Sequence, residues 1–144
     1  MKSRVLHASE HARRFAVVLD PGDEAIWCLR AFADAEQLTG YFTAIGAFRE
    51  ATVAYWEPEL RSYRDIPIHD QVEVLALTGN ISLLDDGTRK VHSHAVLGAS
   101  DGRALGGHLR KGFVRPTLEV LVEESPVRLR RVRDESTGLD LLEL

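Results

Sequence analysis

The stretch KVHSHAVLGASDGRALGGHL, residues 90–109, contains two strand-like segments on either side of Asp101-Gly102. Asp-Gly between such segments is a strong signal for a two-residue hairpin turn, so the stretch predicts two neighbouring antiparallel strands. Residues two apart in a strand point to the same face, about 6.6 Å apart along the backbone, which places His92 beside His94. The hairpin then brings His108 alongside this pair.

Three converging imidazoles form the ligand set of an open metal site. Zn²⁺ binds histidine nitrogens at about 2.0–2.1 Å, and three protein ligands leave a fourth position for water or a substrate. We therefore predict that His92, His94 and His108 bind Zn²⁺ or another divalent transition metal. An HxH pair alone often lies on a polar strand face without any such role, so the third histidine is essential to the prediction. Gly106 and Gly107 favour it, because glycines within a strand mark a bulge or a close backbone approach.

The composition describes one globular domain over residues 1–144, with 134–144 as a C-terminal tail. The 144 residues are 44% hydrophobic and 28% charged, an ordinary soluble balance without a low-complexity tract. The start, MKSRVLHASEHARRF, lacks the apolar run of a secretory signal, and no segment approaches the length of a membrane span. We expect a cytoplasmic protein without a membrane partner. Cys28 is the only cysteine, which excludes an intramolecular disulfide and indicates a small buried apolar residue.

The charge balance does not favour a nucleic-acid partner, although it leaves DNA binding open. The formal net charge is −4, whereas affinity for phosphate backbones comes mainly from lysine and arginine. The one basic cluster is VRLRRVRDES, which holds Arg128, Arg130, Arg131 and Arg133. Acidic residues follow it directly, and charged side chains commonly protect an edge strand, so we interpret this cluster as a solvated strand edge.

The pattern along the chain predicts an α+β fold: a mostly antiparallel, barrel-like sheet with one main helix. RRFAVVL, residues 13–19, is a strand pattern, and a helix is expected from Asp23 to about Leu38, capped by Asp23 and ended near Gly40. Strand patterns separated by turn signals fill the rest of the chain. They cover residues 41–48, 51–57, 62–68, 71–84, 88–98, 103–110, 116–123 and 127–133.

The sequence has more apolar residues in its strands and tail than a sheet with one buried face could cover. The strand pattern VEVLALTGNI alternates poorly, which indicates burial on both faces, by the helix, a second layer or another subunit. The tail TGLDLLEL adds Leu139, Leu141, Leu142 and Leu144, an awkward exposed end unless it docks on a neighbour. We therefore predict a homo-oligomer.

Four segments in order, YFTAIGAF, QVEVLALTGNIS, KVHSHAVLGASDGRALGGHL and FVRPTLEVLVEE, resemble the plants-and-prokaryotes conserved (PPC) domain in its prokaryotic form. The resemblance covers nearly the whole chain, and HxH followed by GGH is its most specific part. It implies an α+β fold, assembly as a homotrimer, and a zinc site at His92, His94 and His108, but no known reaction. The histidine pattern also resembles the zinc site of acetolactate decarboxylase, a more distant relative in fold.

Plant members of this family join the domain to an AT-hook, an Arg-Gly-Arg-Pro segment that enters the DNA minor groove. The present sequence contains no such segment. Their Gly-Arg-Phe-Glu-Ile-Leu hexapeptide for partner binding corresponds here to residues 70–75, DQVEVL, which keeps only Glu73 and Leu75. The transcription-factor role of the plant proteins is therefore not carried over.

Three functions stay open at this point. The first is a metal-binding homotrimeric domain that acts as a metal-dependent enzyme on a small carbonyl or carboxylate substrate. The second is a DNA-binding or transcription-regulatory protein, and the third is a small-molecule sensor or scaffold. The sequence assigns no catalytic or substrate-binding residue, because Glu73 and Glu119 suit a fourth ligand or general base as well as they suit a solvated or interface position.

Overall fold

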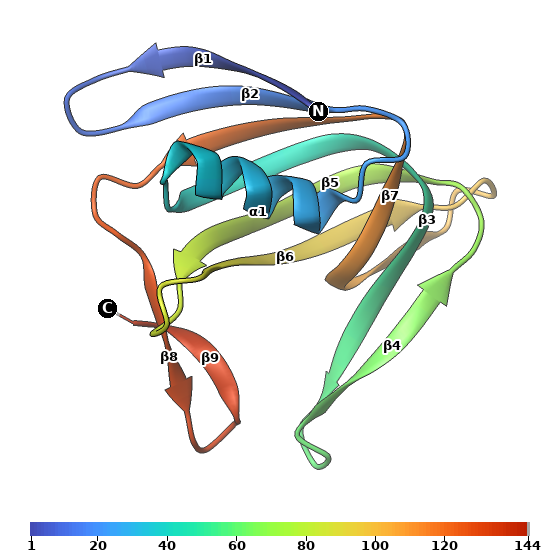
Figure 1. Ribbon diagram of the computed structural model, residues 1–144. Coiled ribbons are helices and arrows are strands. Elements are labelled where there is room, and N and C mark those ends of the chain that lie inside the picture. The colour runs from blue at the N-terminus through green and yellow to red at the C-terminus, as the bar shows by residue number, and fades with distance from the viewer. Residues whose placement is uncertain (144) are drawn as a thin grey trace.

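The computed structural model describes residues 1–143, and these form nine strands and one α-helix (Figure 1). The strands are β1 (Lys2–Ala8), β2 (Arg13–Leu19), β3 (Gly40–Glu57), β4 (Ser62–Ile68), β5 (Val72–Leu83), β6 (Arg89–Gly98), β7 (Ala104–Glu124), β8 (Arg130–Asp134) and β9 (Leu139–Glu143). The helix α1 (Ala25–Glu36) follows β2.

The strands form one sheet that curls on itself. The order is β1-β2-β7-β3-β5-β8-β9, with β4 paired to β3 and β6 paired to both β5 and β7. Strands β3, β5, β6 and β7 therefore close a ring in which every neighbouring pair is antiparallel. The only parallel pairing within residues 1–143 joins β5 to β8 at Leu83 and Arg130. The predicted α+β class, with a mostly antiparallel sheet and one main helix, is confirmed.

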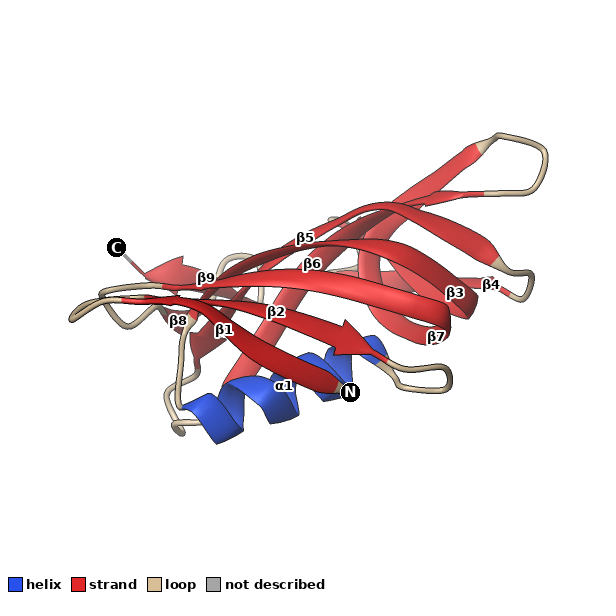
Figure 2. Ribbon diagram, turned by 90° about the horizontal axis from the view of Figure 1, so that it is seen from above, coloured by secondary structure: helices blue, strands red, loops and turns tan. Residues whose placement is uncertain are grey.

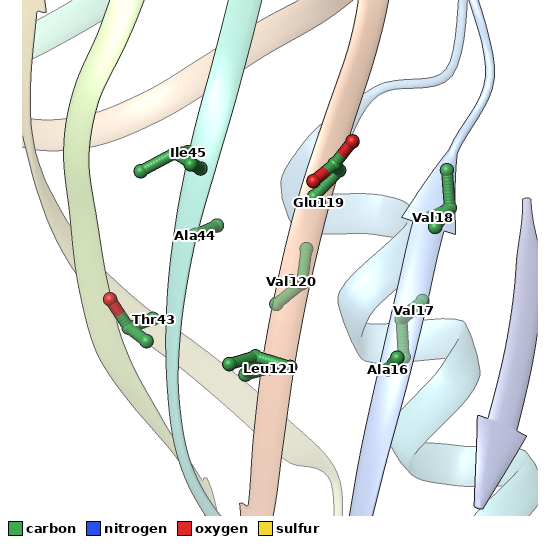
Figure 3. Close-up of a pocket in the computed structure, with 9 residues that line it drawn as sticks. All are labelled: Ala16, Val17, Val18, Thr43, Ala44, Ile45, Glu119, Val120 and Leu121. Carbon is green, nitrogen blue, oxygen red and sulfur yellow. The ribbon is translucent and has the colours of Figure 1, made fainter. Parts of the chain in front are cut away.

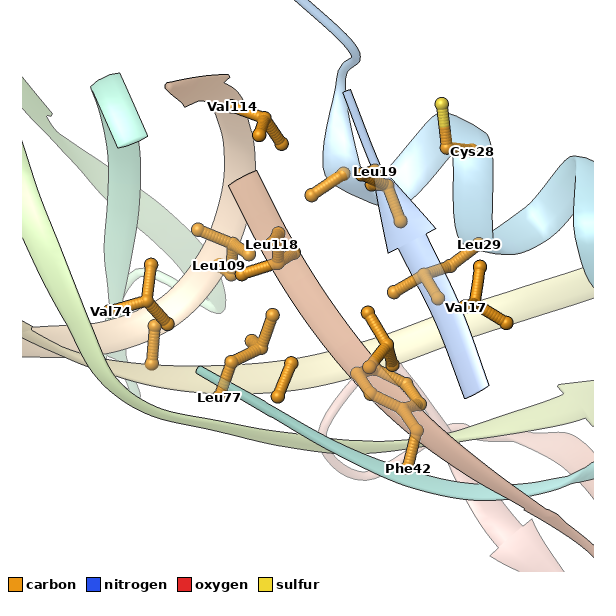
Figure 4. Close-up of a cluster of buried hydrophobic side chains, with 14 of the residues drawn as sticks. Val17, Leu19, Cys28, Leu29, Phe42, Val74, Leu77, Leu109, Val114 and Leu118 are labelled. Carbon is orange, nitrogen blue, oxygen red and sulfur yellow. The ribbon is translucent and has the colours of Figure 1, made fainter. Parts of the chain in front are cut away.

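The hydrophobic core lies between α1 and one face of this sheet (Figures 2 and 4). Fully buried and partly buried positions alternate along the apolar part of β2, so Phe15, Val17 and Leu19 all point inward. Phe15 meets Phe32 of the helix edge to face, with ring centroids 5.2 Å apart. Cys28 is buried in the same cluster, as its surroundings in the sequence predict.

The helix is shorter than predicted at both ends. Its N-cap is Glu24 instead of Asp23, because the Glu24 carboxylate accepts the free backbone N–H groups of Ile26 and Trp27. At the other end Gln37 takes the left-handed conformation, with φ 53°, that ends the helix before Gly40 is reached.

Two pairs of predicted strands are single long strands. Residues 41–48 and 51–57 both belong to β3, and residues 103–110 and 116–123 both belong to β7. The turn-like residues between them correspond to irregular pairing and not to chain reversals. The β3–β7 ladder shifts register near Phe48, and it has no partners assigned between Val114 and Leu118, where Pro116 lacks an N–H to donate.

Both ends of the chain are more regular than expected. The first residues form β1 along β2, an element that the sequence analysis missed. In the tail, Leu139–Glu143 form β9, which pairs with β8 of the same chain, so docking on a neighbour is not needed to order them. Leu144 lies outside the described residues. No helix within residues 1–143 is long and apolar enough to cross a membrane.

Candidate metal centre

The structure brings His92, His94 and His108 together on one face of the sheet. His92 and His94 lie on β6, and His108 lies on β7 directly opposite His94. One ring nitrogen from each residue can be chosen so that all three lie within 4.8 Å of one another. The ring centroids are 5.1 to 5.4 Å apart. A single ion therefore lies within reach of all three side chains.

A hairpin joins these strands at Asp101-Gly102 as predicted, but its loop is longer than two residues, because β6 ends at Gly98 and β7 begins at Ala104. This register places His108 opposite His94, whereas a two-residue turn would place it opposite Ala95. Gly102 adopts a positive φ of 83°, and the Ala99 N–H donates to the Arg103 carbonyl oxygen at 2.9 Å. Gly106 and Gly107 then allow a close approach: a Cβ on either would lie 2.8 Å from a backbone oxygen of a neighbouring strand. The pairing with β6 is regular through both glycines, so they mark a close approach and not a bulge in that ladder.

Burial keeps two of the rings uncharged at neutral pH. His92 and His108 are half-buried, and loss of solvent lowers the pKa of each to about 4. The nearby charge of Arg131 lowers the pKa of His92 further, and the neighbouring His92 and His94 do the same for His108. A neutral imidazole has a nitrogen lone pair to give to a metal, whereas an imidazolium has none.

One atom of the cluster lacks a partner in the protein. The Nδ1 atom of His108 is buried and makes no hydrogen bond. A buried polar atom without a partner costs free energy, and a metal ion or a bound ligand would supply one. The donor set and this orphaned nitrogen both fit a divalent transition metal.

Arg131 of β8 belongs to this site, and the interpretation of its cluster as a solvated edge is wrong for this residue. Its side chain is only 5% exposed, and its Nη2 atom lies 2.8 Å from Nδ1 of His92. Arg130 and Arg133 do point to solvent, where each pairs with carboxylates. Alternation along β8 separates Arg131 from its neighbour Arg130, whereas Arg133 shares the strand side of Arg131 and is nevertheless exposed.

Aromatic side chains border the opposite side of the cluster. The Tyr63 ring of β4 lies 4.7 Å from the His108 ring, centroid to centroid, and Trp56 of β3 contacts Tyr63 at 5.0 Å. Trp27 lies elsewhere, on α1, where it is 68% exposed and is not a core residue. The other three histidines, His7, His11 and His69, are exposed and are not part of the cluster.

The two glutamates left open by the sequence lie elsewhere on the molecule. Glu73 and Glu119 are exposed, and they line a shallow apolar groove together with Ile45 and Leu75. Neither carboxylate is part of the three-histidine group. The structure thus gives neither residue a place as a ligand within one chain.

Comparisons with known proteins support a shared family and fold. A curated relative, bifunctional protein GlmU of Synechococcus sp. (strain JA-3-3Ab), is 32% identical over 130 residues, 88% of this chain but 20% of that protein. The chain thus spans about a fifth of that relative's length. A protein of Staphylococcus aureus described as similar to alpha-acetolactate decarboxylase is 16% identical, with a TM-score of 0.52 over 76% of this chain and 51% of that chain. The last match is a likeness of fold alone.

Two solved structures match over almost their whole length. A metal-containing protein from Archaeoglobus fulgidus is 32% identical, with a TM-score of 0.84 over 91% of this chain and 93% of its own. A protein from Bacteroides thetaiotaomicron, whose name proposes DNA binding, is 27% identical, with a TM-score of 0.85 over 98% and 96%. The family model of the Plants and Prokaryotes Conserved (PCC) domain matches residues 6–126. As the HxH and GGH pattern indicates, this chain belongs to the Plants and Prokaryotes Conserved domain family.

Proposed function

We propose that this protein is a metal-binding domain in which His92, His94 and His108 hold one divalent transition metal, with zinc the first choice. The observation that carries the proposal is the convergence of three ligand nitrogens within 4.8 Å on two adjacent strands. The orphaned Nδ1 of His108 and the metal-containing relative from Archaeoglobus fulgidus support it.

Three protein ligands favour a reactive or ligand-binding role over a structural one. Structural zinc sites usually have four protein ligands, whereas catalytic sites keep one position open. In such a site zinc supplies Lewis acidity, which polarises a carbonyl group and promotes ionisation of water near neutral pH. We infer a metal-dependent enzyme acting on a small carbonyl or carboxylate substrate. A sensor would use the same position without turnover, so binding shown by thermal shift together with a turnover assay separates the two.

The metal is tested by elemental analysis of purified protein. We expect about one metal ion per chain in the wild type. The double variant His92→Ala/His94→Ala should lose it, because a single imidazole from His108 remains. The matched control is His7→Ala/His11→Ala, which removes two exposed histidines outside the cluster. Equal metal content in the wild type and the first variant would contradict the proposed site.

We also propose that the chain assembles as a homotrimer through the sheet face that carries the histidines. His94, Thr78, Thr43 and Leu121 are cross-strand partners in one row, so they share a face. This face bears large exposed apolar side chains and a groove of about 360 Å³ lined by Ile45, Leu121 and their neighbours (Figure 3). Contiguous apolar surface of this kind is typical of an interface between subunits.

DNA binding is the second candidate, favoured by the name of the Bacteroides thetaiotaomicron relative. Its electrostatic support is weak, because the net charge is −4 and the exposed Arg130 and Arg133 already lie near carboxylates. Binding to duplex DNA that weakens steeply with added salt would favour this function, since each phosphate contact releases counterions.

A further inference from the structure

Arg131 is a buried cation in direct contact with His92, one of the three proposed metal ligands. Its Nε atom donates to Oγ of Ser82 at 3.0 Å, and its Nη1 atom donates to the backbone oxygen of Asp140 at 2.7 Å. The Nη2 atom lies 3.0 Å from Oδ1 of Asn80 and 2.8 Å from Nδ1 of His92. The backbone of β8 and these contacts hold the guanidinium over the edge of the histidine cluster.

None of these partners is negatively charged. Among the described residues Arg131 forms no ion pair, and the Asp140 carboxylate is engaged by Lys90 at 2.7 Å and by Arg133 at 3.7 Å. The Asp140 carboxylate therefore attracts Arg131 only from a longer range, and the buried charge has no direct counterion. Such a charge is costly, and a divalent metal on the histidines would add two more positive charges beside it. The site is therefore complementary to a ligand that carries negative charge.

The contact between Arg131 and His92 also has to change when a metal binds. A guanidinium only donates hydrogen bonds, so Nδ1 of His92 accepts, and the neutral ring carries its proton on Nε2. A metal on Nδ1 would displace Arg131. A metal on Nε2 would move the ring proton to Nδ1, which then faces another donor. In both cases one N–H of Arg131 loses its acceptor next to the metal.

The His108 side of the cluster is aromatic. Tyr63 lies against His108, and it comes from β4, whereas Arg131 comes from β8. The β3–β4 and β8–β9 hairpins project to the same side of the sheet, with β6 between them (Figure 1). A ligand at the histidines thus meets a cation from one hairpin and an aromatic ring from the other. This combination suits a small molecule with a carboxylate at one end and an apolar part at the other.

We propose that Arg131 recognises the carboxylate of a small anionic ligand held at the three-histidine centre, and so sets the substrate class of the site. This inference rests on the proposed metal function. Released from His92, an N–H of the Nη2 atom can donate a charge-assisted hydrogen bond to a carboxylate oxygen, while Ser82 and the Asp140 backbone keep the guanidinium in place.

The test uses the full chain loaded with Co²⁺, whose visible absorption reports changes at the metal. Cobalt stoichiometry is measured first for the wild type, Arg131→Gln, Arg131→Lys and the control Arg133→Gln, which alters an exposed arginine two residues along β8. Each protein is then titrated with acetate as the anionic probe and with imidazole as the neutral probe. Circular dichroism confirms that each variant is folded.

We expect Arg131→Gln to weaken acetate binding about tenfold or more, the loss that follows from removing one charge-assisted carboxylate contact. Arg131→Lys should weaken acetate binding less, because lysine keeps the positive charge although it lacks the planar guanidinium group. The acetate affinity of Arg133→Gln should stay within about twofold of the wild type. Imidazole affinity should change by less than about twofold throughout, because a neutral ligand gains nothing from the cation.

Two failures are distinguishable. A wild type that takes up no cobalt would refute the metal site and this inference together. Normal cobalt uptake with unchanged acetate affinity in Arg131→Gln would refute the role of Arg131 alone. If Arg131→Gln does not fold, the test uses Arg131→Lys in its place. An acetate affinity of Arg131→Lys equal to that of the wild type would then overturn the proposal.

Discussion

His92 and His108 make the stability of the metal-free protein depend on pH. Their folded-state pKa values of about 4 lie below the value of 6.5 expected for unfolded chains. Between these values the unfolded state binds protons that the folded state does not, so stability is full above about pH 6.5 and falls as the pH drops toward 4. We expect the melting temperature of the metal-free protein to follow this course.

The double variant His92→Gln/His108→Gln should flatten that decline, because it removes the groups that take up protons on unfolding. The control His7→Gln/His11→Gln changes exposed rings and should keep the wild-type profile. A melting curve for the first variant that falls with pH as steeply as that of the wild type would contradict the assignment.

The sequence was sufficient to find the histidines but not Arg131. The side-by-side placement of His92 and His94 follows from the two-residue period of a strand, and the Asp-Gly signal locates the hairpin that returns His108. The length of its loop, which decides that His108 faces His94, was not predicted correctly. The contact of Arg131 with His92 depends on pairing between β8 and β5, two strands far apart in the chain. The local sequence does not show which face of a short basic strand other parts of the protein cover. Alternation alone therefore could not predict whether the Arg131 side chain is buried or exposed.

At the scale of elements, Glu24 connects the helix to the sheet. Its carboxylate caps α1 through Ile26 and Trp27, and it also accepts the backbone N–H of Gly112 in β7 at 3.1 Å. We expect Glu24→Ala to destabilise the protein by about 1–2 kcal/mol, the usual cost of losing a helix cap. Glu59→Ala, in an exposed turn, is the control. Denaturant unfolding measures both, and equal stability of the two variants would count against the cap.

The ends of the helix and strands were the least predictable part of the fold, because contacts with distant segments decide them. Asp23 is the residue type that usually caps a helix, but its carboxylate instead accepts the backbone N–H of Asp20 in the preceding turn. Similarly, turn-like residues divided β3 and β7 in the sequence pattern, whereas pairing with partners on both sides carries these strands through their irregularities. Tertiary pairing overrides local signals at such positions.

At the scale of the whole molecule, the apolar sheet face predicts assembly. Tyr41, Ile45, Leu75 and Leu121 are 51%, 59%, 55% and 55% exposed, although all four are large apolar or aromatic residues. For the wild type, sedimentation or light scattering should give a mass three times the 16.1 kDa of one chain. Leu121→Glu should yield monomers, because a buried carboxylate without a partner costs several kcal/mol at each interface.

The matched control is Leu60→Glu, which places the same charge on a still more exposed leucine, 69% against 55%, at the turn between β3 and β4. It should keep the wild-type mass. A monomeric wild type, or a Leu121→Glu variant that stays assembled, would contradict the proposed interface.

The closed ring of β3, β5, β6 and β7 has a consequence for how this family can vary. His94 and His108 are held by ladders on both sides of β6 and β7, with His108 opposite Ala54 as well as His94. The turn at residues 99–103 brings β6 and β7 together, and the ladders with β5 and β3 hold the same spacing of the ligands from the outer sides. Insertions there should leave the ligand set intact, unlike in centres built on loops, where each added residue shifts a ligand.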